Sequence, residues 1–509
     1  MLLVLAVLLA GCGVFGGNSG NGSEAKPSLT PSPIEPSGSS AVSPPPTSSS
    51  LRRYYEQKLR WHKCRGSDQC ARLRVPLDYA EPTGREISIS VLKVPATSPA
   101  DRIGSLLVNP GGPGVSGVDY AAASGLGAEL RRVFDVVGFD PRGVGESTPL
   151  RCSSDAELDA LLASDPDPDS PAEARRSDAL ITQFGDGCVR RSGALAAHIS
   201  TQEGARDMDV LRAAVGDAKL SYFGFSYGTL LGATYAGLFP QRVGRMVLDG
   251  AVDPSLSSVQ TGLVSAGGFD TALRAYVAHC VDQGGCFLGA TVDQGLTRIQ
   301  KFLDEVDAKP LPGAGARQLT EGYAVLGIWQ PLYYRSEWSL LDSSLKAAFA
   351  GNGAPLLSLA DYYTDRGPSG FRDNSVDLLY AVNCLDQDDG VPSSKVPSLV
   401  PEFEKVSKTW GRIFAYGAAL CAAWPVHSGH KPAAIHAKGS APIMVVGTTR
   451  DPATPVEQAR SLARQLDNAV LVTRNGDGHL AYHKGNSCVD TTIESYLVSG
   501  KVPRKEVHC

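Results

Sequence analysis

A serine between two glycines, set between an expected strand and an expected helix, is the feature that most constrains the fold of this chain. The motif Gly224-Phe225-Ser226-Tyr227-Gly228 follows a segment typical of a buried strand, residues 219–223, and precedes one typical of a helix, residues 228–236. A serine on a sharp strand-to-helix turn needs small residues two positions before and after it, because larger side chains would collide there. The pattern therefore predicts a nucleophile elbow and a sheet flanked by helices.

A serine nucleophile needs an acidic residue that orients its base, and in this kind of fold the order along the chain is Ser, Asp, His. Asp451 follows an apolar segment, residues 441–447, that is expected to form a strand. Catalytic groups collect where parallel strands end, at their carboxyl edge. We therefore predict that Ser226 is the nucleophile and Asp451 the acid.

The predicted base is His479. It follows a further expected strand, residues 469–473, and lies at the end of a polar, glycine-rich segment, 475–479, interpreted as a loop. The segment between Asp451 and this strand has room for one helix near residues 456–466, as two parallel strands require. Strand order alone leaves two rival acids, Asp249 and Asp253, which follow another expected strand.

An oxyanion hole requires two N–H donors. The first is predicted to be the backbone N–H of Tyr227, at the start of the helix after the serine. The second is expected from the run Asn109-Pro110-Gly111-Gly112-Pro113-Gly114, which follows an apolar segment. Gly111 and Gly112 both remain candidates. Farther along, Asp140 and Arg142 are interpreted as a structural salt bridge beneath the site.

Length and charge limit the remaining possibilities. A chain of 509 residues exceeds the ~250 to 300 residues at which one core usually stops growing, so at least two compact units are expected. A net charge of −5 without a block of lysine and arginine argues against nucleic acid as a partner. His479 and His483 are four residues apart, but no glutamate follows His479, so no zinc site is predicted. The sequence predicts no metal and no cofactor.

More than 180 residues separate Asp253 from the strand at 441–447, and the sheet does not need them. Their periodicity is mostly helical, which predicts a helical cap inserted between strands 6 and 7 of the core. The expected helices cover residues 260–281, 291–306, 321–329 and 336–350. The predicted α/β-hydrolase core comprises residues 51–254 and 426–509, and the predicted cap residues 255–425.

Two polar residues are weaker candidates for substrate binding. Asp386 lies in an acidic run, residues 383–389, that could hold the free amino group of a substrate. The run could equally be a solvated loop that caps a helix. Thr454 lies close to Asp451 and could support the site, or it could simply begin the following helix.

The first 50 residues indicate export. Residues 2–10 form an apolar run too short to span a bilayer, and the run ends in Leu9-Ala10-Gly11-Cys12. This segment, residues 1–17, resembles a bacterial lipoprotein signal with Cys12 as the lipidated residue, although no positive charge precedes it. In residues 18–50, 18 of 33 residues are serine or proline, which predicts a disordered tether. The expected location is the cell envelope, anchored to the membrane.

Ten cysteines remain besides Cys12, an even number that suits a disulfide framework in an exported protein. Sequence alone leaves the connectivity open. Pairing between nearest neighbours is the least entangled arrangement, and it predicts the pairs Cys64–Cys70, Cys152–Cys188, Cys280–Cys286, Cys384–Cys421 and Cys488–Cys509.

Taken together, five motifs give the chain a family resemblance from about Trp61 to Cys509. The chain resembles the actinobacterial tripeptidyl aminopeptidase-like α/β-hydrolases, a group that includes secreted aminopeptidases and a mycobacterial cell-envelope lipoprotein described as both protease and carboxylesterase. The motifs that carry this resemblance are Asn109-Pro110-Gly111-Gly112-Pro113-Gly114, Gly138-Phe139-Asp140-Pro141-Arg142-Gly143, Gly224-Phe225-Ser226-Tyr227-Gly228-Thr229, Leu248-Asp249-Gly250-Ala251-Val252-Asp253-Pro254 and Asp451-Pro452-Ala453-Thr454-Pro455.

The resemblance implies Ser226, Asp451 and His479 as the triad and argues against Asp249 and Asp253. It implies an enzyme that releases short peptides from a free N-terminus of a peptide or protein. The alternative is a carboxylesterase or lipase acting on envelope or small esters, and a more remote one is an inactive surface binding protein. The complete predicted triad argues against the last.

Overall fold

The structure is a computed structural model, and it describes residues 29–34, 49–123 and 125–509. The predicted signal segment, residues 1–17 with Cys12, lies outside the described residues. Among the helices of the described ranges, none has the length and hydrophobicity needed to cross a lipid bilayer.

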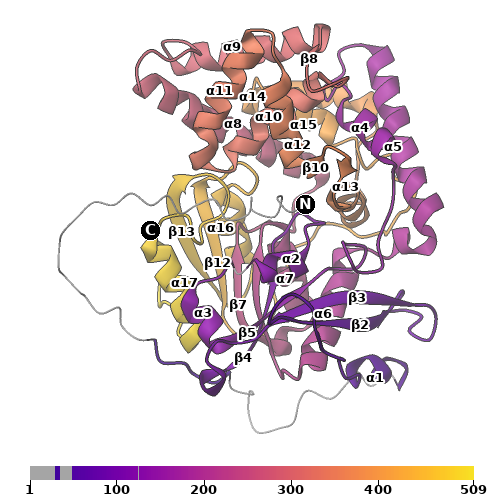
Figure 1. Cartoon of the computed structure of the whole chain (residues 1–509), viewed down its shortest axis with the longest axis vertical. Coiled ribbons are helices and arrows are strands. Elements are labelled where there is room, and N and C mark those ends of the chain that lie inside the picture. The colour runs from indigo at the N-terminus through magenta and orange to yellow at the C-terminus, as the bar shows by residue number, and fades with distance from the viewer. Residues whose placement is uncertain (1–28, 35–48, 124) are drawn as a thin grey trace, which may run out of the picture.

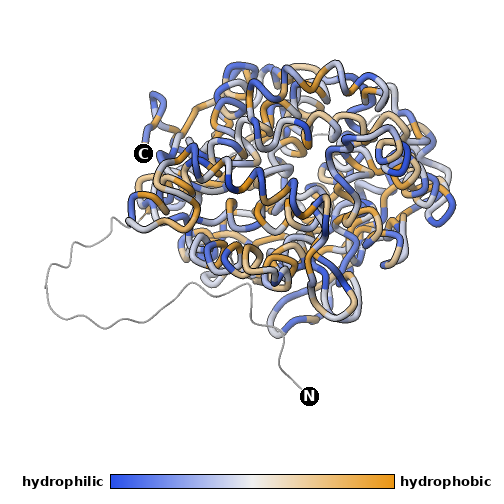
Figure 2. Tube along the Cα trace, turned by 90° about the horizontal axis from the view of Figure 1, so that it is seen from above, coloured by the Kyte–Doolittle hydropathy of each residue, from blue (hydrophilic) through white to orange (hydrophobic). Residues whose placement is uncertain are grey.

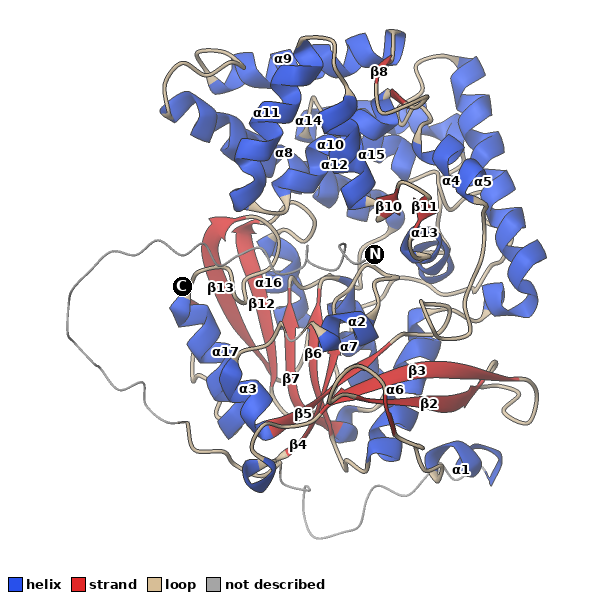
Figure 3. Ribbon diagram, in the orientation of Figure 1, coloured by secondary structure: helices blue, strands red, loops and turns tan. Residues whose placement is uncertain are grey.

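A ten-stranded sheet forms the centre of the molecule (Figure 3). The strands on one side are antiparallel to their neighbours, and those from β5 onward run parallel. In spatial order they are β1 (His62–Lys63), β2 (Gln69–Pro76), β3 (Glu86–Val94), β5 (Phe134–Phe139), β4 (Gly104–Asn109), β6 (Leu220–Phe225), β7 (Val243–Asp249), β12 (Ile443–Arg450), β13 (Ala469–Asp477) and β14 (Val507–His508).

The central strands are buried on both faces. Every residue of β4, β5, β6 and β7 is buried, as expected for parallel strands that helices cover on both sides. One face packs against α2 (Gly117–Ala122), α3 (Ala128–Val133) and α17 (Ser487–Ser499). The other packs against α6 (Thr201–Val215), α7 (Tyr227–Leu238) and α16 (Val456–Gln465). This is the predicted α/β-hydrolase architecture.

A mainly helical cap stands at one end of the sheet, between β7 and β12 in the sequence (Figure 1). The four helices expected from the sequence are present as α8 to α11, with ends shifted by a few residues. The cap helices are α8 (Ser258–Asp282), α9 (Val292–Ala308), α10 (Glu321–Leu332), α11 (Trp338–Phe349), α12 (Ala354–Tyr363), α13 (Ser375–Asp386), α14 (Val396–Val406) and α15 (Gly411–Gly417). Two small hairpins join them, β8 (Leu311–Pro312) with β9 (Gln318–Leu319) and β10 (Arg366–Gly367) with β11 (Gly370–Phe371).

Amphipathic periodicity explains why these segments are helical. In α9, for example, Leu296, Ile299 and Phe302 are buried while Lys301 and Asp304 are exposed. Figure 2 shows hydrophilic and hydrophobic residues alternating around the helical turns across the molecule. Each helix buries its apolar side against its neighbours, which is the usual source of helix stability in proteins.

Two helices that the sequence analysis did not assign lie beside the cap, although they precede the nucleophile in the chain. They are α4 (Asp155–Leu162) and α5 (Pro171–Ser192), visible next to the cap in Figure 1. Both begin with a capping box, in which a serine side chain and a glutamate three residues later satisfy backbone N–H groups. Arg366 of the cap binds Asp159 of α4 through two N–H···O bonds of 2.7 Å. The helices α4 and α5, called here the helical arm, extend the cap.

The range predicted as a disordered tether contains a packed segment, residues 29–34. Ser32 N donates to Val498 O at the end of α17 (3.2 Å), and the guanidinium of Arg245 donates to Ser32 O and Pro33 O. The prediction was wrong for these six residues, because their carbonyl groups satisfy a buried arginine. A short helix, α1 (Ser49–Tyr55), then begins just inside the end of the predicted tether.

The described part of the chain contains five disulfides, and they are the five pairs that nearest-neighbour pairing predicts. The pair Cys488–Cys509 holds the end of the chain against the first turn of α17. The last strand, β14, pairs with β13 just ahead of His479. This disulfide therefore anchors the edge of the sheet that carries the predicted base.

Candidate active site

Ser226 lies on the turn between β6 and α7 with φ 54° and ψ −123°, a region that residues with a side chain rarely adopt. Its own backbone is held from two sides. Ser226 N donates to Asp249 O of the neighbouring strand (2.9 Å), and Ser226 O accepts from the N–H and hydroxyl of Thr229 (2.8 and 2.6 Å). Such strain persists only where the surroundings enforce it, and it places the serine side chain beyond the end of the sheet.

The two glycines of the motif are required by close backbone approach. A Cβ at Gly224 would lie 2.4 Å from Gly228 O, and a Cβ at Gly228 would lie 2.6 Å from Asn109 O. Both distances are far below ordinary contact. The structure thus confirms the predicted strand–turn–helix context of the elbow.

Asp451 and His479 form a buried hydrogen-bonded pair. His479 Nδ1 lies 2.9 Å from each Asp451 carboxylate oxygen, and the two residues are 8% and 1% exposed, respectively. Since a carboxylate only accepts, Nδ1 carries the hydrogen and Nε2 keeps the lone pair that a general base needs. Within the described residues, no hydrogen bond joins Ser226 to His479, and catalytic contacts of this kind commonly tighten when substrate binds.

The Asp451 carboxylate is fixed by four further donors. Oδ1 accepts from the N–H groups of Ala453 and Thr454 (3.0 and 2.9 Å), and Oδ2 accepts from Leu480 N and the Thr454 hydroxyl (both 3.0 Å). The same hydroxyl lies 3.3 Å from His479 Nδ1. Thr454 therefore contacts both Asp451 and His479.

The two rival acids do not touch His479. Asp249 accepts from Ala481 N (3.0 and 3.1 Å) and Tyr482 N (2.9 Å), so it holds the backbone just beyond the histidine. Burial raises its pKa above the usual range. Asp253 accepts from the Gln465 side chain at 2.6 Å, well away from the pair. The geometry places only Asp451 against the imidazole.

The segment before His479 differs from the prediction. Residues 475–477 belong to β13 rather than to a loop, and Asp477 pairs in register with Arg450 of β12 across an irregularity in the ladder. Asp477 also binds Arg335 of the cap (2.9 Å). The ion pair between Arg450 of β12 and Asp477 joins the two strands and extends β13 through a polar sequence that by itself is typical of a loop.

A cap residue supports the histidine directly. His479 N donates to Tyr333 O (2.9 Å), and the two rings meet edge to face with centroids 5.2 Å apart. Gly478 allows this approach, because a Cβ there would lie 2.6 Å from Tyr333 O. Nothing in the local pattern around Tyr333 indicates this contact, and sequence analysis missed it.

The two predicted oxyanion segments lie side by side. A Cβ at Gly111 would lie 2.6 Å from Phe225 O and 3.2 Å from Tyr227 N, so the glycine loop packs directly on the elbow. Gly111 N, however, donates to the side chain of Asn109 (3.0 Å). This leaves Gly112 N as the better-placed donor from the loop. Tyr227 N is in the first turn of α7, where N–H groups have no partner within the helix.

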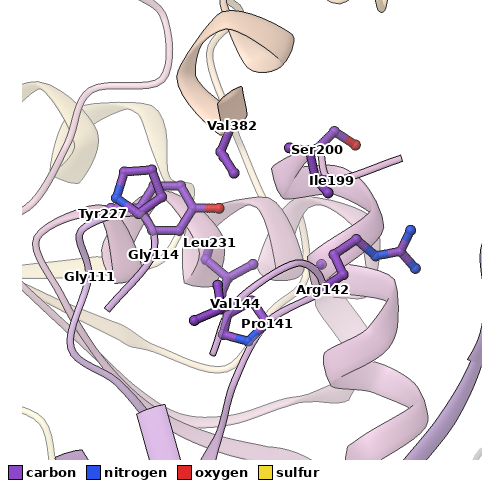
Figure 4. A pocket seen from close by; sticks show the side chains of 12 residues that line it. Gly111, Gly114, Pro141, Arg142, Val144, Ile199, Ser200, Tyr227, Leu231 and Val382 are labelled. Carbon is purple, nitrogen blue, oxygen red and sulfur yellow. The ribbon is translucent and has the colours of Figure 1, made fainter. Parts of the chain in front are cut away.

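The side chain of Tyr227 lines a small, mainly apolar cavity (Figure 4). Its hydroxyl lies 2.6 Å from Thr201 Oγ1, and Thr201 N donates to Asp386 (2.9 Å). The Thr201 hydroxyl donates to the other Asp386 oxygen. Burial raises the pKa of Asp386 to about 7. The candidate Asp386 is thus part of a buried chain that ends on Tyr227, and its place as an amine anchor stays a prediction.

Asp140 and Arg142 do not form the expected salt bridge. Asp140 accepts from the Ser116 hydroxyl and from backbone N–H groups of Val118 and Glu146. Arg142 instead binds Asp207 through two N–H···O bonds of 2.8 Å, behind the glycine loop. The prediction was wrong because the buried guanidinium finds a bidentate partner on α6, which the local sequence does not reveal.

Relatives with known names match nearly the whole chain. A serine protease, Hip1, from Mycobacterium tuberculosis is 37% identical over 89% of this chain and 91% of its own length. Carboxylesterase B from the same organism is 37% identical over 88% of this chain and 89% of its own length. A tripeptidyl aminopeptidase from Streptomyces lividans is 32% identical over 87% of this chain and 83% of its own length.

The family model described as TAP-like protein matches residues 407–509, the part that carries Asp451 and His479. The relatives share most of the chain and are hydrolases named as peptidases or an esterase. The protein is therefore an α/β-hydrolase enzyme, and the chain belongs to the tripeptidyl aminopeptidase-like family of serine hydrolases.

Proposed function

We propose that the protein is a serine peptidase that releases short peptides from free N-termini through an acyl-enzyme. The proposal is carried by the buried Asp451–His479 pair together with a serine held on a strained elbow. The relatives named serine protease and tripeptidyl aminopeptidase support the peptidase assignment.

In the first half of the reaction, His479 Nε2 takes the proton of Ser226 Oγ as the oxygen attacks the scissile carbonyl carbon. Asp451 stabilises the imidazolium that forms and keeps the ring oriented. The oxyanion accepts hydrogen bonds from the N–H groups of Tyr227 and Gly112. His479 then gives its proton to the leaving amine, and the acyl group stays on Ser226.

In the second half, water gives a proton to His479 and attacks the acyl carbon. The ester bond to Ser226 breaks, and the serine oxygen takes the proton back from the histidine. No further group is needed for atoms and charges to balance. The role proposed for the elbow is electrostatic, since its donors are fixed before the negative charge appears.

For selection of a free N-terminus we propose Asp386. Its carboxylate is linked through Thr201 to Tyr227, the neighbour of the nucleophile. An ammonium group beside a carboxylate favours the ionised acid, so the bound substrate would lower the raised pKa of Asp386. A carboxylesterase is the second candidate, supported by the equally similar carboxylesterase B.

For location, we propose a membrane-anchored protein of the cell envelope. The supporting features are the apolar run that ends at Cys12 and five disulfides, a number typical of an oxidising compartment.

Three substrates test the activity of the full-length chain: a tripeptide amide with a free amino group, its N-acetylated form, and a p-nitrophenyl ester. We expect cleavage of the free-amine peptide and much weaker cleavage of the acetylated one. Ser226→Ala should abolish all turnover without loss of the fold. Ser221→Ala is the matched control, because Ser221 lies buried on β6, the strand that leads to Ser226, and its hydroxyl has no hydrogen-bond partner among the described residues.

Ester turnover with neither peptide cleaved would reject the peptidase and favour the esterase. Undiminished turnover by folded Ser226→Ala would reject the triad. Asp386→Asn separates the anchor from the chemistry, since loss of the preference for the free amine should raise KM for that peptide while ester turnover persists. An unchanged KM would remove Asp386 from substrate binding.

A further inference from the structure

Three carboxylates converge at the junction of the cap and the helical arm. Asp165 lies in the loop between α4 and α5, Asp307 in the last turn of α9, and Glu321 at the first position of α10. One oxygen from each lies within 4.8 Å of the other two. Residues far apart in the sequence are thus brought together. None of them lies on the elements that carry Ser226, Asp451 or His479.

Glu321 is buried, and one of its two carboxylate oxygens has no hydrogen-bond partner among the described residues. The residue is 5% exposed, and the unpartnered oxygen is Oε2. A buried carboxylate is costly unless it is paired, hydrogen-bonded or bound to a metal, and nearly all buried polar groups in proteins are satisfied. One carboxylate oxygen of Glu321 belongs to the group formed with Asp165 and Asp307. This side chain is the observation that distinguishes the group from an ordinary acidic cluster.

The charges of the cluster are not balanced from within. Arg412 approaches from the far side, with Nε 3.5 Å from Asp167 and Nη2 donating to the carbonyl groups of Asp167 and Pro168.

A second acidic group provides a contrast. Asp78, His198 and Glu203 also lie within reach of one another. There, however, Glu203 is 3.3 Å from the guanidinium of Arg142 and 3.0 Å from His198 Nδ1. That group already has a positive partner, the guanidinium of Arg142. In the cluster around Glu321, by contrast, no described lysine or arginine forms an ion pair with Glu321.

The loop that carries Asp165 is stiff and closely packed. Its sequence, Asp165-Pro166-Asp167-Pro168-Asp169, places a carboxylate at every second residue, and each proline fixes one backbone torsion. Asp167 N donates to Asp165 Oδ1 (2.9 Å). The start of α10 rests directly on this region, since a Cβ at Gly322 would lie 2.4 and 2.5 Å from the carbonyl oxygens of Leu162 and Ser164.

We propose that Asp165, Asp307 and Glu321 bind a divalent cation of the calcium class, with Asp167 beside them as a further oxygen donor. Calcium–oxygen distances are about 2.3–2.6 Å, so two ligands on opposite sides of the ion are about 4.6–5.2 Å apart. The three oxygens lie within 4.8 Å of one another, close enough to share one ion. Carboxylates alone, with no histidine or cysteine, favour Ca²⁺ over zinc or copper.

The ion has a structural position. It joins the loop of the helical arm, the end of α9 and the start of α10. The opposite end of α10 leads to Tyr333, whose carbonyl accepts from His479 N (2.9 Å). A cation at the start of this 12-residue helix therefore stabilises the helix whose other end leads to the residue that contacts His479, the proposed base.

Calorimetric titration of the full-length chain with CaCl₂ and with MgCl₂, after treatment with a chelator, tests the proposal. We expect one Ca²⁺ per chain with a Kd on the order of 10⁻⁴ M, typical of extracellular sites, and weaker binding of Mg²⁺. Glu321→Gln and Asp307→Asn should each raise the Kd for Ca²⁺ at least tenfold. Asp304→Asn, one turn earlier on α9 and exposed, should leave it unchanged.

Absence of Ca²⁺ binding at concentrations about ten times the expected Kd would overturn the proposal. So would wild-type affinity in both Glu321→Gln and Asp307→Asn, since the ion would then bind elsewhere. Asp307 is exposed, so its variant remains informative even if Glu321→Gln fails to fold. The thermal midpoint should rise with Ca²⁺ in the wild type and in Asp304→Asn but not in Asp307→Asn.

Discussion

Replacing each of two buried aspartates by asparagine distinguishes the acid of the triad from its neighbour. In Asp451→Asn one carboxylate oxygen becomes an amide NH₂. The less costly orientation puts NH₂ at the Oδ2 position, where the Thr454 hydroxyl can turn to accept but Leu480 N loses its acceptor. One buried N–H without a partner costs ~1–3 kcal/mol of stability.

The effect on turnover should be larger than the effect on stability. The NH₂ group lies as close to His479 Nδ1 as the remaining oxygen does, so the tautomer with its hydrogen on Nε2, which cannot accept the serine proton, becomes populated, and the negative charge that stabilises the imidazolium is lost. In serine proteases the corresponding change lowers kcat by about 10⁴-fold, or roughly 5.4 kcal/mol. We expect a loss of that order, measured with the ester substrate and normalised to folded protein by circular dichroism.

Asp249→Asn is the matched control, since it makes the same atom exchange at a buried site nearby. The Oδ2 position already accepts from both Ala481 N and Tyr482 N, so a single amide oxygen there keeps both donors paired. The substitution also removes the cost of burying a charge, which is the cause of the raised pKa of Asp249. We expect less than about tenfold loss of turnover and about 1 kcal/mol or less of stability. A loss in Asp249→Asn equal to that in Asp451→Asn, or near-normal turnover in Asp451→Asn, would refute the assignment.

Three further predictions concern Gly111, Asp386 and the disulfide of Cys509. Gly111→Ala should lower kcat/KM by about 100-fold or more, checked with the ester assay, because its Cβ would strike Phe225 O and displace the oxyanion loop. Ionised Asp386 is disfavoured in the folded state, so wild-type stability should fall as pH rises from about 4 to above 7; denaturant unfolding should show Asp386→Asn gaining relative to wild type over that interval. Cys509→Ser should cost about 3 kcal/mol by thermal unfolding, because it opens the loop closed with Cys488; equal midpoints for the two proteins would contradict this.

Local backbone chemistry made much of the site predictable. Ser226 is marked by glycines that the turn requires, and Asp451 and His479 each follow an apolar strand in the expected order. These features are encoded within a few residues of the group they position. The helical cap was predictable for a similar reason, since amphipathic periodicity is a local property.

Contacts between distant segments were not predictable in this way. Tyr333 supports His479 from the cap, and Arg142 pairs with Asp207 rather than with its neighbour Asp140. In both cases the partner is chosen by tertiary packing. The extension of β13 to Asp477 has the same origin, because an ion pair across the strands outweighs the loop-like composition of residues 475–477.

The cap divides the catalytic groups along the chain, and this has a consequence for when activity arises. Asp451 and His479 follow Ser226 only after the cap, 225 and 253 residues later in the chain. Since chains emerge from the ribosome N-terminus first, a chain made only as far as the cap has the proposed nucleophile without the proposed acid and base. Under the proposed mechanism, hydrolysis can begin only after the chain has been made through the cap and as far as His479.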